Sequence, residues 1–286
     1  MKIPLHKPFH FESAIKSHGW WMLSPNYWDA EGQVYYRPLH LSNEKTILVS
    51  VSYTDMYLIV ENETTRSLHE NDWHEIKEQI AWIFRLEEDF DDFYALSQEL
   101  GELHHLSKGR KGRLLRSPTL FEDVVKVILT TNTRWSQTIA MSHNLVTHLG
   151  EPVKTDSQKS WNTFPTPDRI LEAGETYLKE HIRVGYRSAY LVDAATKALD
   201  HTFDLESFKQ SHKNSAELKT IKGVGPYAFN TLSMLLGKYD SLPIDSEYRK
   251  HVLEKYFHGE TPSKKEFESV YDKWGDYKYL AYWFDQ

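Results

Sequence analysis

Two glycines around a single valine, followed by a proline, form the segment of this chain best suited to bind an anion. Residues 223–226 read Gly-Val-Gly-Pro and connect one apolar stretch to the next, and the glycines let the backbone turn tightly with its N–H groups uncovered. Pro226 fits the first turn of a new helix, where its missing N–H costs nothing. The free backbone amides and the helix dipole at the start of a helix both favour a negative charge. We therefore predict a phosphate-binding turn here.

A carboxylate follows that proline nineteen residues later in the sequence. Asp245 lies in the run Pro-Ile-Asp-Ser-Glu, which taken alone is a good helix start with Asp245 as the N-cap. The dipole that favours a carboxylate at such a position also favours its ionised form. The same side chain can therefore cap a helix and present a fixed negative charge.

Together, the two features resemble the signature of a known superfamily. Leu218-x-x-Ile221, the Gly-Val-Gly-Pro turn and Asp245 are similar to the helix-hairpin-helix and Gly/Pro…Asp signature of the DNA glycosylases that include endonuclease III. The resemblance covers residues 116–284 well and the preceding part only loosely. It implies a helical DNA-binding body and an enzyme of base-excision repair.

Two branches of that superfamily are matched by different segments. The residues that look like bacterial 3-methyladenine glycosylase II are Phe-Pro-Thr-Pro at 164–167, Tyr227 and Trp283-Phe284. The residues that look more like 8-oxoguanine glycosylase are Thr131-Asn132 and Gly185-Tyr186-Arg187. Both branches carry an N-terminal sheet domain, so the resemblance leads us to expect one here.

The resemblance assigns the chemistry to Asp245. The sugar gains positive charge as the base departs, and a fixed carboxylate beside C1′ stabilises that transition state. In lyase-competent relatives the residue after the proline is a Lys that forms a Schiff base, whereas this chain has Tyr227, whose phenol cannot form that imine. We therefore expect a monofunctional glycosylase in which water captures the sugar, with Lys219 and Lys222 as minor alternative nucleophiles.

Base excision also requires the target base to be flipped out of the duplex and the gap to be filled. By resemblance, Asn132 fills the gap, Tyr186 wedges beside the orphaned base and Arg187 touches that base. The alternative interpretations are a helix C-cap for Asn132, ordinary packing for Tyr186 and a surface charge for Arg187.

The base pocket is expected to be aromatic. Tyr227, Trp283 and Phe284 match positions that stack on electron-poor alkylated bases in the 3-methyladenine glycosylases. A cationic base over such rings gains about 0.5–2 kcal/mol. The alternative for Trp283 is a core position, since an aromatic C-terminal helix is more often core.

The hairpin is expected to hold the DNA backbone through the amides of Gly223, Gly225 and Ala228. In the family a monovalent cation, K⁺ or Na⁺, often lies on the other side of the turn. The backbone carbonyls that the resemblance implies as its ligands are those of Lys219, Ile221 and Val224. We expect no other cofactor, and the cation would be structural.

The lack of cysteine excludes several kinds of catalytic and metal site. The chain has no Cys, which excludes disulfides, a Cys nucleophile, a thiolate zinc site and the four-cysteine iron–sulfur cluster of some superfamily members. The 15 His are scattered, and His104-His105 lacks the i, i+4 spacing that places two imidazoles on one helix face. We expect these imidazoles to be solvated or capping.

The net charge of −7 at first argues against a nucleic-acid partner. Residues 1–106 contain 8 Lys and Arg against 18 Asp and Glu, a net charge of −10, whereas residues 107–286 contain 26 against 23, a net charge of +3. Ser107–Arg116 holds five Lys and Arg residues, no acidic residue and two glycines, which would let DNA phosphates approach its backbone. The alternative is a solvent-exposed surface, the usual role of such a run of charges.

The hydrophobic pattern predicts an α+β fold of segregated elements. Residues 33–41, 46–53 and 56–60 read as strands of one antiparallel sheet, with a turn at Thr54-Asp55, and helical periodicity begins at Glu70. Ser117 and Thr166 are placed to cap later helices. We expect an N-terminal antiparallel sheet domain with acidic connecting helices at 1–106 and an all-α helix-hairpin-helix glycosylase domain at 107–286, whose last helices form a pocket wall.

The resulting hypothesis is a monofunctional DNA base-excision repair glycosylase that flips a damaged purine, alkylated as in 3-methyladenine, and leaves an abasic site. The alternatives are an 8-oxoguanine DNA glycosylase and a non-catalytic helix-hairpin-helix protein that binds duplex DNA. The expected partner is double-stranded DNA with a damaged base, bound by a monomer. Without an apolar run of about 18 residues or a signal-peptide core we expect no membrane contact and an intracellular protein, cytoplasmic and nucleoid-associated if bacterial.

Overall fold

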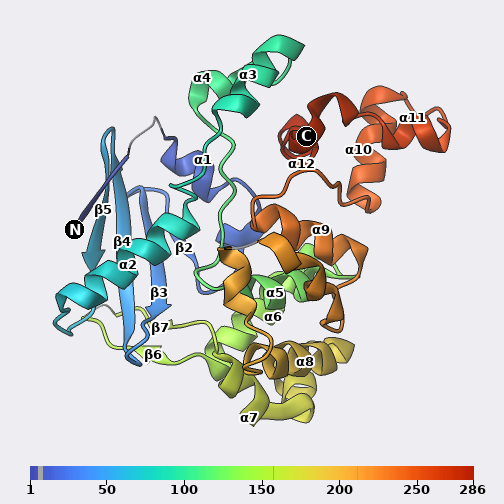
Figure 1. Ribbon diagram of the computed structural model, residues 1–286. Coiled ribbons are helices and arrows are strands. Elements are labelled where there is room, and N and C mark those ends of the chain that lie inside the picture. Colours follow the sequence, from blue (N-terminus) through green and yellow to red (C-terminus); the bar gives the residue numbers. More distant parts are fainter. Residues whose placement is uncertain (6–8, 157, 211) are drawn as a thin grey trace.

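A five-stranded antiparallel sheet is joined to a larger body of helices in the computed structural model, which describes residues 1–5, 9–156, 158–210 and 212–286 (Figure 1). The strands are β1 (Lys2–Pro4), β2 (Tyr27–Asp29), β3 (Val34–His40), β4 (Thr46–Thr54) and β5 (Tyr57–Asn62). Their order across the sheet is β1-β5-β4-β3-β2. The α+β prediction with an N-terminal antiparallel sheet is confirmed.

The sheet forms because β-branched and aromatic residues recur along its strands. Tyr35 of β3 faces Val51 of β4, and Val51 faces Val60 of β5; all three side chains are fully buried. The three predicted strands correspond to β3, β4 and β5, but the turn between the last two lies at Asp55-Met56, one residue later than the predicted Thr54-Asp55.

Helix α2 (Glu70–Ile83) crosses the sheet in Figure 1. Its buried residues Ile76, Ile80 and Ile83 recur every three or four positions, so they form the single apolar stripe that the periodicity predicted. Leu48 points to the opposite face of the sheet, where it packs against Val153 and Trp161. Both faces of the sheet are therefore covered.

The remaining elements build the helical body and its connections. The α-helices are α1 (Phe11–Ile15), α3 (Asp91–Leu100), α4 (His104–Gly109), α5 (Leu120–Thr130), α6 (Trp135–Leu149), α7 (Pro167–Tyr177), α8 (Ser188–Ala198), α9 (Pro226–Leu235), α10 (Ser246–Tyr256), α11 (Lys264–Glu268) and α12 (Lys278–Asp285). The segments of 3-10 or π-helix are η1 (Gly19–Met22), η2 (Leu178–Ile182), η3 (Gly185–Arg187), η4 (Leu205–Lys209), η5 (His212–Thr220) and η6 (Asp272–Tyr277). Two short strands, β6 (Pro152–Val153) and β7 (Trp161–Asn162), pair with each other.

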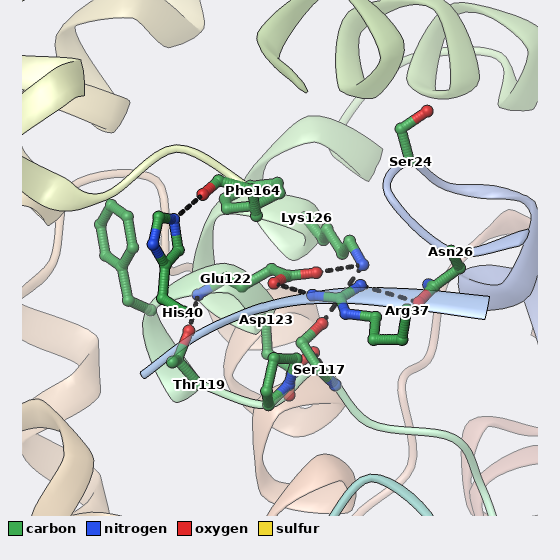
Figure 2. Close-up of polar contacts among 12 residues, drawn as sticks. Ser24, Asn26, Arg37, His40, Ser117, Thr119, Glu122, Asp123, Lys126 and Phe164 are labelled. Atoms are coloured by element: carbon green, nitrogen blue, oxygen red, sulfur yellow. Dashed lines mark hydrogen bonds and ion pairs between the residues drawn. The ribbon is translucent and has the colours of Figure 1, made fainter. Parts of the chain in front are cut away.

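Three buried charged side chains join the sheet to the helical body (Figure 2). Arg37 of β3 donates from Nη2 to one carboxylate oxygen of Glu122 on α5. The other oxygen of Glu122 lies 2.6 Å from Nζ of Lys126, one helical turn further along α5. Arg37 also donates from Nη1 to Oδ1 of Asn26 at 2.7 Å. A carboxylate between two cations thus replaces the water that all three groups lose on burial.

The start of α5 differs from the prediction that Ser117 is its N-cap. Thr119 caps the helix instead, its hydroxyl accepting from the Glu122 amide at 3.2 Å. Ser117 is buried, its amide donates to Asp123 Oδ1 at 3.0 Å, and its hydroxyl accepts from Lys126 at 3.3 Å. The prediction was wrong because the buried charges hold Ser117, whereas the cap at Thr166 is confirmed by its bond from the Arg169 amide.

The division into 1–106 and 107–286 stays a prediction, and its two halves include the undescribed residues 6–8, 157 and 211. One hydrophobic core runs through both halves, from Ile3 of β1 to Tyr282 of α12. Strands β6 and β7 belong to the second half but pack on the sheet of the first. Within the described residues, no helix is both long and apolar enough to cross a membrane.

We predict that Glu122→Gln lowers the free energy of unfolding by about 3–5 kcal/mol, because it leaves the cations of Arg37 and Lys126 buried without their carboxylate. Glu12→Gln is the matched control: its partner Lys16 lies 2.7 Å away, but both side chains are well exposed, at 48% and 39%. The control is expected to lose less than about 1 kcal/mol. Denaturant unfolding measures both, and equal losses would contradict the prediction.

Candidate active site

The predicted phosphate-binding turn lies between η5 and α9. Gly223 has φ +89°, and a Cβ there would meet Cδ2 of Tyr190 at 2.6 Å, so the fold requires glycine at this position. Gly225 has an ordinary φ of −78°, and a Cβ there would meet nothing within 4 Å. The packing of the protein does not explain Gly225, and its missing side chain leaves the start of α9 open.

The start of α9 carries unsatisfied backbone donors. Gly225 is the N-cap and makes no side-chain hydrogen bond, and Pro226 occupies the first helical turn as predicted. The first amides of a helix have no partner within the helix itself. The positive end of the α9 dipole thus has no side-chain cap directly after the turn at Gly223, an arrangement that suits a phosphate.

Asp245 caps α10, as its sequence context predicted. Its Oδ1 accepts from the Tyr248 amide at 2.8 Å, and the side chain is half-buried. The cap fixes the carboxylate at the positive end of the α10 dipole. Capping uses Oδ1, and the same residue lines a large cleft.

That cleft, of about 1620 Å³, brings together segments from both halves of the chain. The hairpin and the start of α10 supply one side, from Lys219 to Ala228 and from Pro243 to Glu247. The other lining residues are His18, Gly19, Trp20, Met22, residues 130–135, Thr138, Tyr186, Tyr190, Thr231, Met234, Tyr279, Tyr282, Trp283 and Gln286. The phosphate-binding turn and Asp245 therefore open into one concave space.

Aromatic residues form the wall of the cleft near Asp245. Burial raises the pKa of Tyr227, and the negative charge of Asp245 raises it further. Burial is also the largest cause that raises the pKa of Tyr279 and of Tyr282, and the charge of Asp245 contributes to both, so all three phenols stay protonated. Of the predicted pocket residues, Tyr227 and Trp283 line this cleft.

Phe284 does not line the cleft. It follows Trp283 on α12, about 100° further around the helix, and packs half-buried against the core. Tyr279 and Tyr282 line the wall instead, although only the aromatic density of the C-terminal stretch indicated them in the sequence. The last helix therefore supplies a pocket wall through the face that carries Tyr279, Tyr282 and Trp283.

The loop between α5 and α6 carries Asn132, exposed in the cleft with φ +46°. Thr131 is the C-cap of α5, so Asn132 does not have the capping role. Tyr186 is 50% exposed at the same cleft. Arg187 is buried and donates to the backbone carbonyls of Thr131 and Asn132. Its guanidinium carbon lies 4.7 Å from the Tyr186 ring centroid. Arg187 thus supports the two exposed residues and does not reach into the cleft.

Tyr190 connects these residues to the hairpin. Its ring lies against the backbone of Gly223, where any side chain would collide with it. The same ring meets Tyr186 edge-on, at 5.6 Å between centroids and 77° between planes. Packing therefore fixes the position of Tyr186 relative to the phosphate-binding turn.

Sequence reasoning missed the N-terminal contribution to the cleft. His18, Trp20 and Met22 line it, although they lie more than 100 residues before the hairpin. Trp20 donates from Nε1 to Asp123 at 2.7 Å, and His18 Nε2 lies 2.6 Å from the carbonyl of Leu115. Burial lowers the pKa of His18 to about 3, so its ring is neutral. No local pattern reveals contacts at such sequence separation.

The basic run Ser107–Arg116 is only partly available to DNA. Arg116 is buried and pairs with Glu88 at 2.8 Å, and Arg113 is buried with its guanidinium 4.9 Å from the Phe90 ring centroid. The expectation of a phosphate-binding run was wrong for these two residues. The acidic stretch that precedes them in the sequence neutralises part of their charge inside the protein.

The described residues contain no cluster of three or more His, Asp or Glu side chains that could hold a metal ion. The expected cation ligands are backbone carbonyls of the hairpin, whose residues Lys219, Ile221 and Val224 line the cleft. The Ile221 carbonyl accepts from the Val224 amide at 3.0 Å and keeps a second lone pair. Carbonyl oxygens suit a hard cation, so this donor set fits the expected ion.

Residues 125–276 match the HhH-GPD superfamily of base excision DNA repair proteins. Because the match spans more than half of the sequence, the chain belongs to this superfamily, and the resemblance seen at the hairpin and Asp245 is confirmed. The chain is also 24% identical over 200 residues to a probable N-glycosylase/DNA lyase of Methanothermobacter thermautotrophicus. That alignment covers 61% of this chain and 62% of the relative, so the chain spans less than two thirds of that relative's length.

Solved structures with the same fold carry two kinds of name. A 3-methyladenine DNA glycosylase from Archaeoglobus fulgidus matches with a TM-score of 0.79 and 20% identity, over 99% of this chain and 97% of that one. The 8-oxoguanine glycosylase/lyase of Clostridium acetobutylicum, in its apo form, matches with a TM-score of 0.71 and 20% identity, over 99% and 97%. At such identities the likeness establishes the fold alone.

We predict that the two glycines of the hairpin respond differently to alanine. Gly223→Ala lowers the free energy of unfolding by about 1–2 kcal/mol or more, because its φ is left-handed and Tyr190 occupies the space of the Cβ. Gly225→Ala leaves stability within about 0.5 kcal/mol, because its Cβ meets open space. Denaturant unfolding of both variants measures the difference, and a similar loss in the two would contradict it.

Proposed function

We propose that this protein is a monofunctional DNA glycosylase that removes damaged purines from duplex DNA, with alkylated bases such as 3-methyladenine preferred. The observation that carries the proposal is the shared cleft, which holds an uncapped helix start, the fixed carboxylate of Asp245 and an aromatic wall. Each of these features serves one part of the reaction: binding the backbone, stabilising the sugar and holding the base.

Asp245 supplies the electrostatic part of the mechanism. As the N-glycosidic bond breaks, its electrons leave with the base and positive charge develops on the sugar. A carboxylate already fixed by the α10 cap stabilises that charge without reorganisation. Water then adds to C1′, and its released proton passes to the Asp245 carboxylate or to solvent, which leaves an abasic site.

Tyr227 supports hydrolysis without lyase action. A lyase needs an amine that attacks C1′, but the residue after Pro226 is a phenol with a raised pKa. The ammonium of Lys219 lies 4.1 Å from the Phe229 ring centroid, and that of Lys222 lies 3.8 Å from Asp193. Both line the cleft but are engaged elsewhere, so we do not propose either as the nucleophile.

The proposed preference for alkylated purines rests on the wall formed by Tyr227, Tyr279, Tyr282 and Trp283. Alkylation gives a purine positive charge, and neutral aromatic faces attract a cation. Excision of 8-oxoguanine is the second candidate, favoured by Asn132 and the exposed Tyr186. The names of the structural relatives are divided between these two substrates.

The proposed partner is double-stranded DNA with a damaged base, bound by a monomer. The α9 amides would hold the phosphates, Asn132 would fill the gap left by the flipped base, and Tyr186 would wedge beside the orphaned base, with Arg187 fixing both residues. We also propose that the carbonyls of Lys219, Ile221 and Val224 hold a structural K⁺ or Na⁺, which supports the hairpin and takes no part in the chemistry.

We predict that Asp245→Asn lowers the single-turnover rate of base release by at least about 10²-fold, because the amide keeps the helix cap but loses the charge. Affinity for undamaged duplex is expected to stay within about twofold. Asp204→Asn is the matched control, since Asp204 caps η4 by accepting from the Ser207 amide at 3.2 Å and does not line the cleft. Unchanged release by the Asp245 variant would reduce Asp245 to a cap.

A second prediction concerns the product. Incubation with duplexes carrying one N-methylated purine or one 8-oxoguanine is expected to give strand breaks only after alkali, because Tyr227 cannot form an imine. Borohydride is expected to trap no covalent complex. Strand nicking without alkali, together with a trapped complex, would overturn the monofunctional mechanism, and comparison of the two lesions decides between the substrates.

A further inference from the structure

A second cluster of polar side chains lies where α12 meets α10, outside the lining of the cleft. The Asp285 carboxylate ends α12 and is 14% exposed. Its Oδ2 accepts from the hydroxyls of Tyr256 at 2.7 Å and Tyr271 at 2.8 Å, and His251 Nε2 lies 3.1 Å away. Its Oδ1 lies 2.6 Å from Nζ of Lys255. One carboxylate thus lies within hydrogen-bonding distance of four polar groups, from α10 and from the segment before η6.

The charges in this cluster are complementary. Burial alone favours a neutral carboxyl, but Lys255, Tyr256, Tyr271 and His251 together hold the pKa of Asp285 below its usual value. Burial and the neighbouring carboxylate raise the pKa of both tyrosines. At neutral pH the carboxylate is therefore ionised and both phenols keep the protons that they donate.

The stability of α12 itself does not explain this residue. A negative charge in the last turn of a helix is opposed by the helix dipole. An isolated helix of eight residues is also too short to form without tertiary contacts. Asp285 therefore weakens its own helix and gains stability only from the groups of α10 and Tyr271 that surround it.

The two helices joined by Asp285 are those that carry the proposed active site. Helix α10 begins at its cap Asp245, and α12 supplies Tyr279, Tyr282 and Trp283 to the cleft. The Tyr282 ring lies between the cluster and the cleft, 5.9 Å from the Tyr271 ring and lining the wall. A shift of α12 relative to α10 would change the distance from the aromatic wall to the carboxylate.

Other contacts hold α12 to different parts of the molecule. Trp283 donates from Nε1 to the carbonyl of Ser17 at 2.7 Å, and the Tyr279 amide donates to the carbonyl of Tyr239 at 2.8 Å. Neither contact reaches α10. The placement of α12 on α10 therefore depends on the polar contacts of Asp285 together with the packing of Tyr282.

We propose that Asp285 is a positioning residue of the active site, which clasps α12 to α10 and so sets the aromatic wall at a fixed distance from Asp245. This inference rests on the proposed glycosylase function, because the wall and the carboxylate are assigned there to base and sugar. Helix α12 holds the base, and the start of α10 stabilises the charge on the sugar. The distance between these two helices therefore decides whether base and sugar are both bound in the reactive geometry.

The first test is Asp285→Asn, which keeps the size of the side chain but removes its charge and two lone-pair acceptors. The saturated single-turnover rate on whichever lesion duplex the wild type cleaves is expected to fall about 10–100-fold. Affinity for undamaged duplex is expected to stay within about twofold, because the hairpin is not touched. Rates within twofold of wild type would overturn the proposal.

Asp272→Asn is the matched control. Asp272 pairs with Lys278 at the start of the same helix at 3.0 Å, but its side chain is 59% exposed. An exposed pair contributes little, so this variant is expected to release base at the wild-type rate. An equal loss in both variants would mean that any change of charge beside α12 has the same effect, which would overturn the specific role of Asp285.

A double-mutant cycle separates positioning from general destabilisation. Tyr256→Phe removes one donor to Asp285 and is expected to lower the saturated rate about threefold to tenfold. In Asp285→Ala, the same change is expected to have little further effect, because no side-chain acceptor remains for the Tyr256 hydroxyl. Additive losses would contradict a clasp that acts through this carboxylate.

Hydrogen exchange tests the clasp without relying on activity. In Asp285→Asn, the amides of residues 278–285 are expected to exchange faster, while those of α9 keep their wild-type protection. If the wild type releases no base from any lesion duplex, the proposed function fails, and exchange alone then decides whether the clasp exists. Unchanged exchange in α12 would overturn it.

Discussion

The ion cluster of Arg37, Glu122 and Lys126 is the constraint on which the rest of the structure depends. All three charged side chains are buried on folding, and they keep their ion-pair partners only while β3 and α5 hold their positions relative to each other. Helix α5 begins beside this cluster and ends at the loop that carries Asn132. One residue along, Asp123 accepts from Trp20, which lines the cleft. The interface between sheet and helices thus also sets the shape of the cleft.

Burial decides which charged residues are available to a polyanion. Arg113, Arg116 and Arg187 are cations in a chain that belongs to a DNA repair superfamily, yet all three are buried and bound to carbonyls, a carboxylate or an aromatic ring. The uncapped amides of α9 add positive potential to that of Lys219, Lys222 and Arg134, which line the same cleft. This explains how a protein with a net charge of −7 can present a favourable surface to phosphate.

The features that could be predicted from the sequence are those with a local cause. The hairpin glycines, the cap at Asp245 and the strands β3 to β5 each follow from neighbouring residues. Long-range contacts decided the rest. Ser117 lost its predicted capping role to a buried charge cluster, and His18 and Trp20 reach the cleft through partners about 100 residues away. Sequence spacing along one helix could not tell that Tyr282, and not Phe284, faces the cleft.

The hydrogen bond from Trp283 to the carbonyl of Ser17 spans 266 positions of sequence. Contacts between residues so far apart in sequence raise the contact order of the fold. The chain loses the conformational entropy of the intervening loop before such contacts can stabilise it. During synthesis, the hairpin and Asp245 emerge from the ribosome before Tyr279, Tyr282 and Trp283, the part of the aromatic wall that α12 supplies. The complete cleft therefore forms only when both distant segments are present.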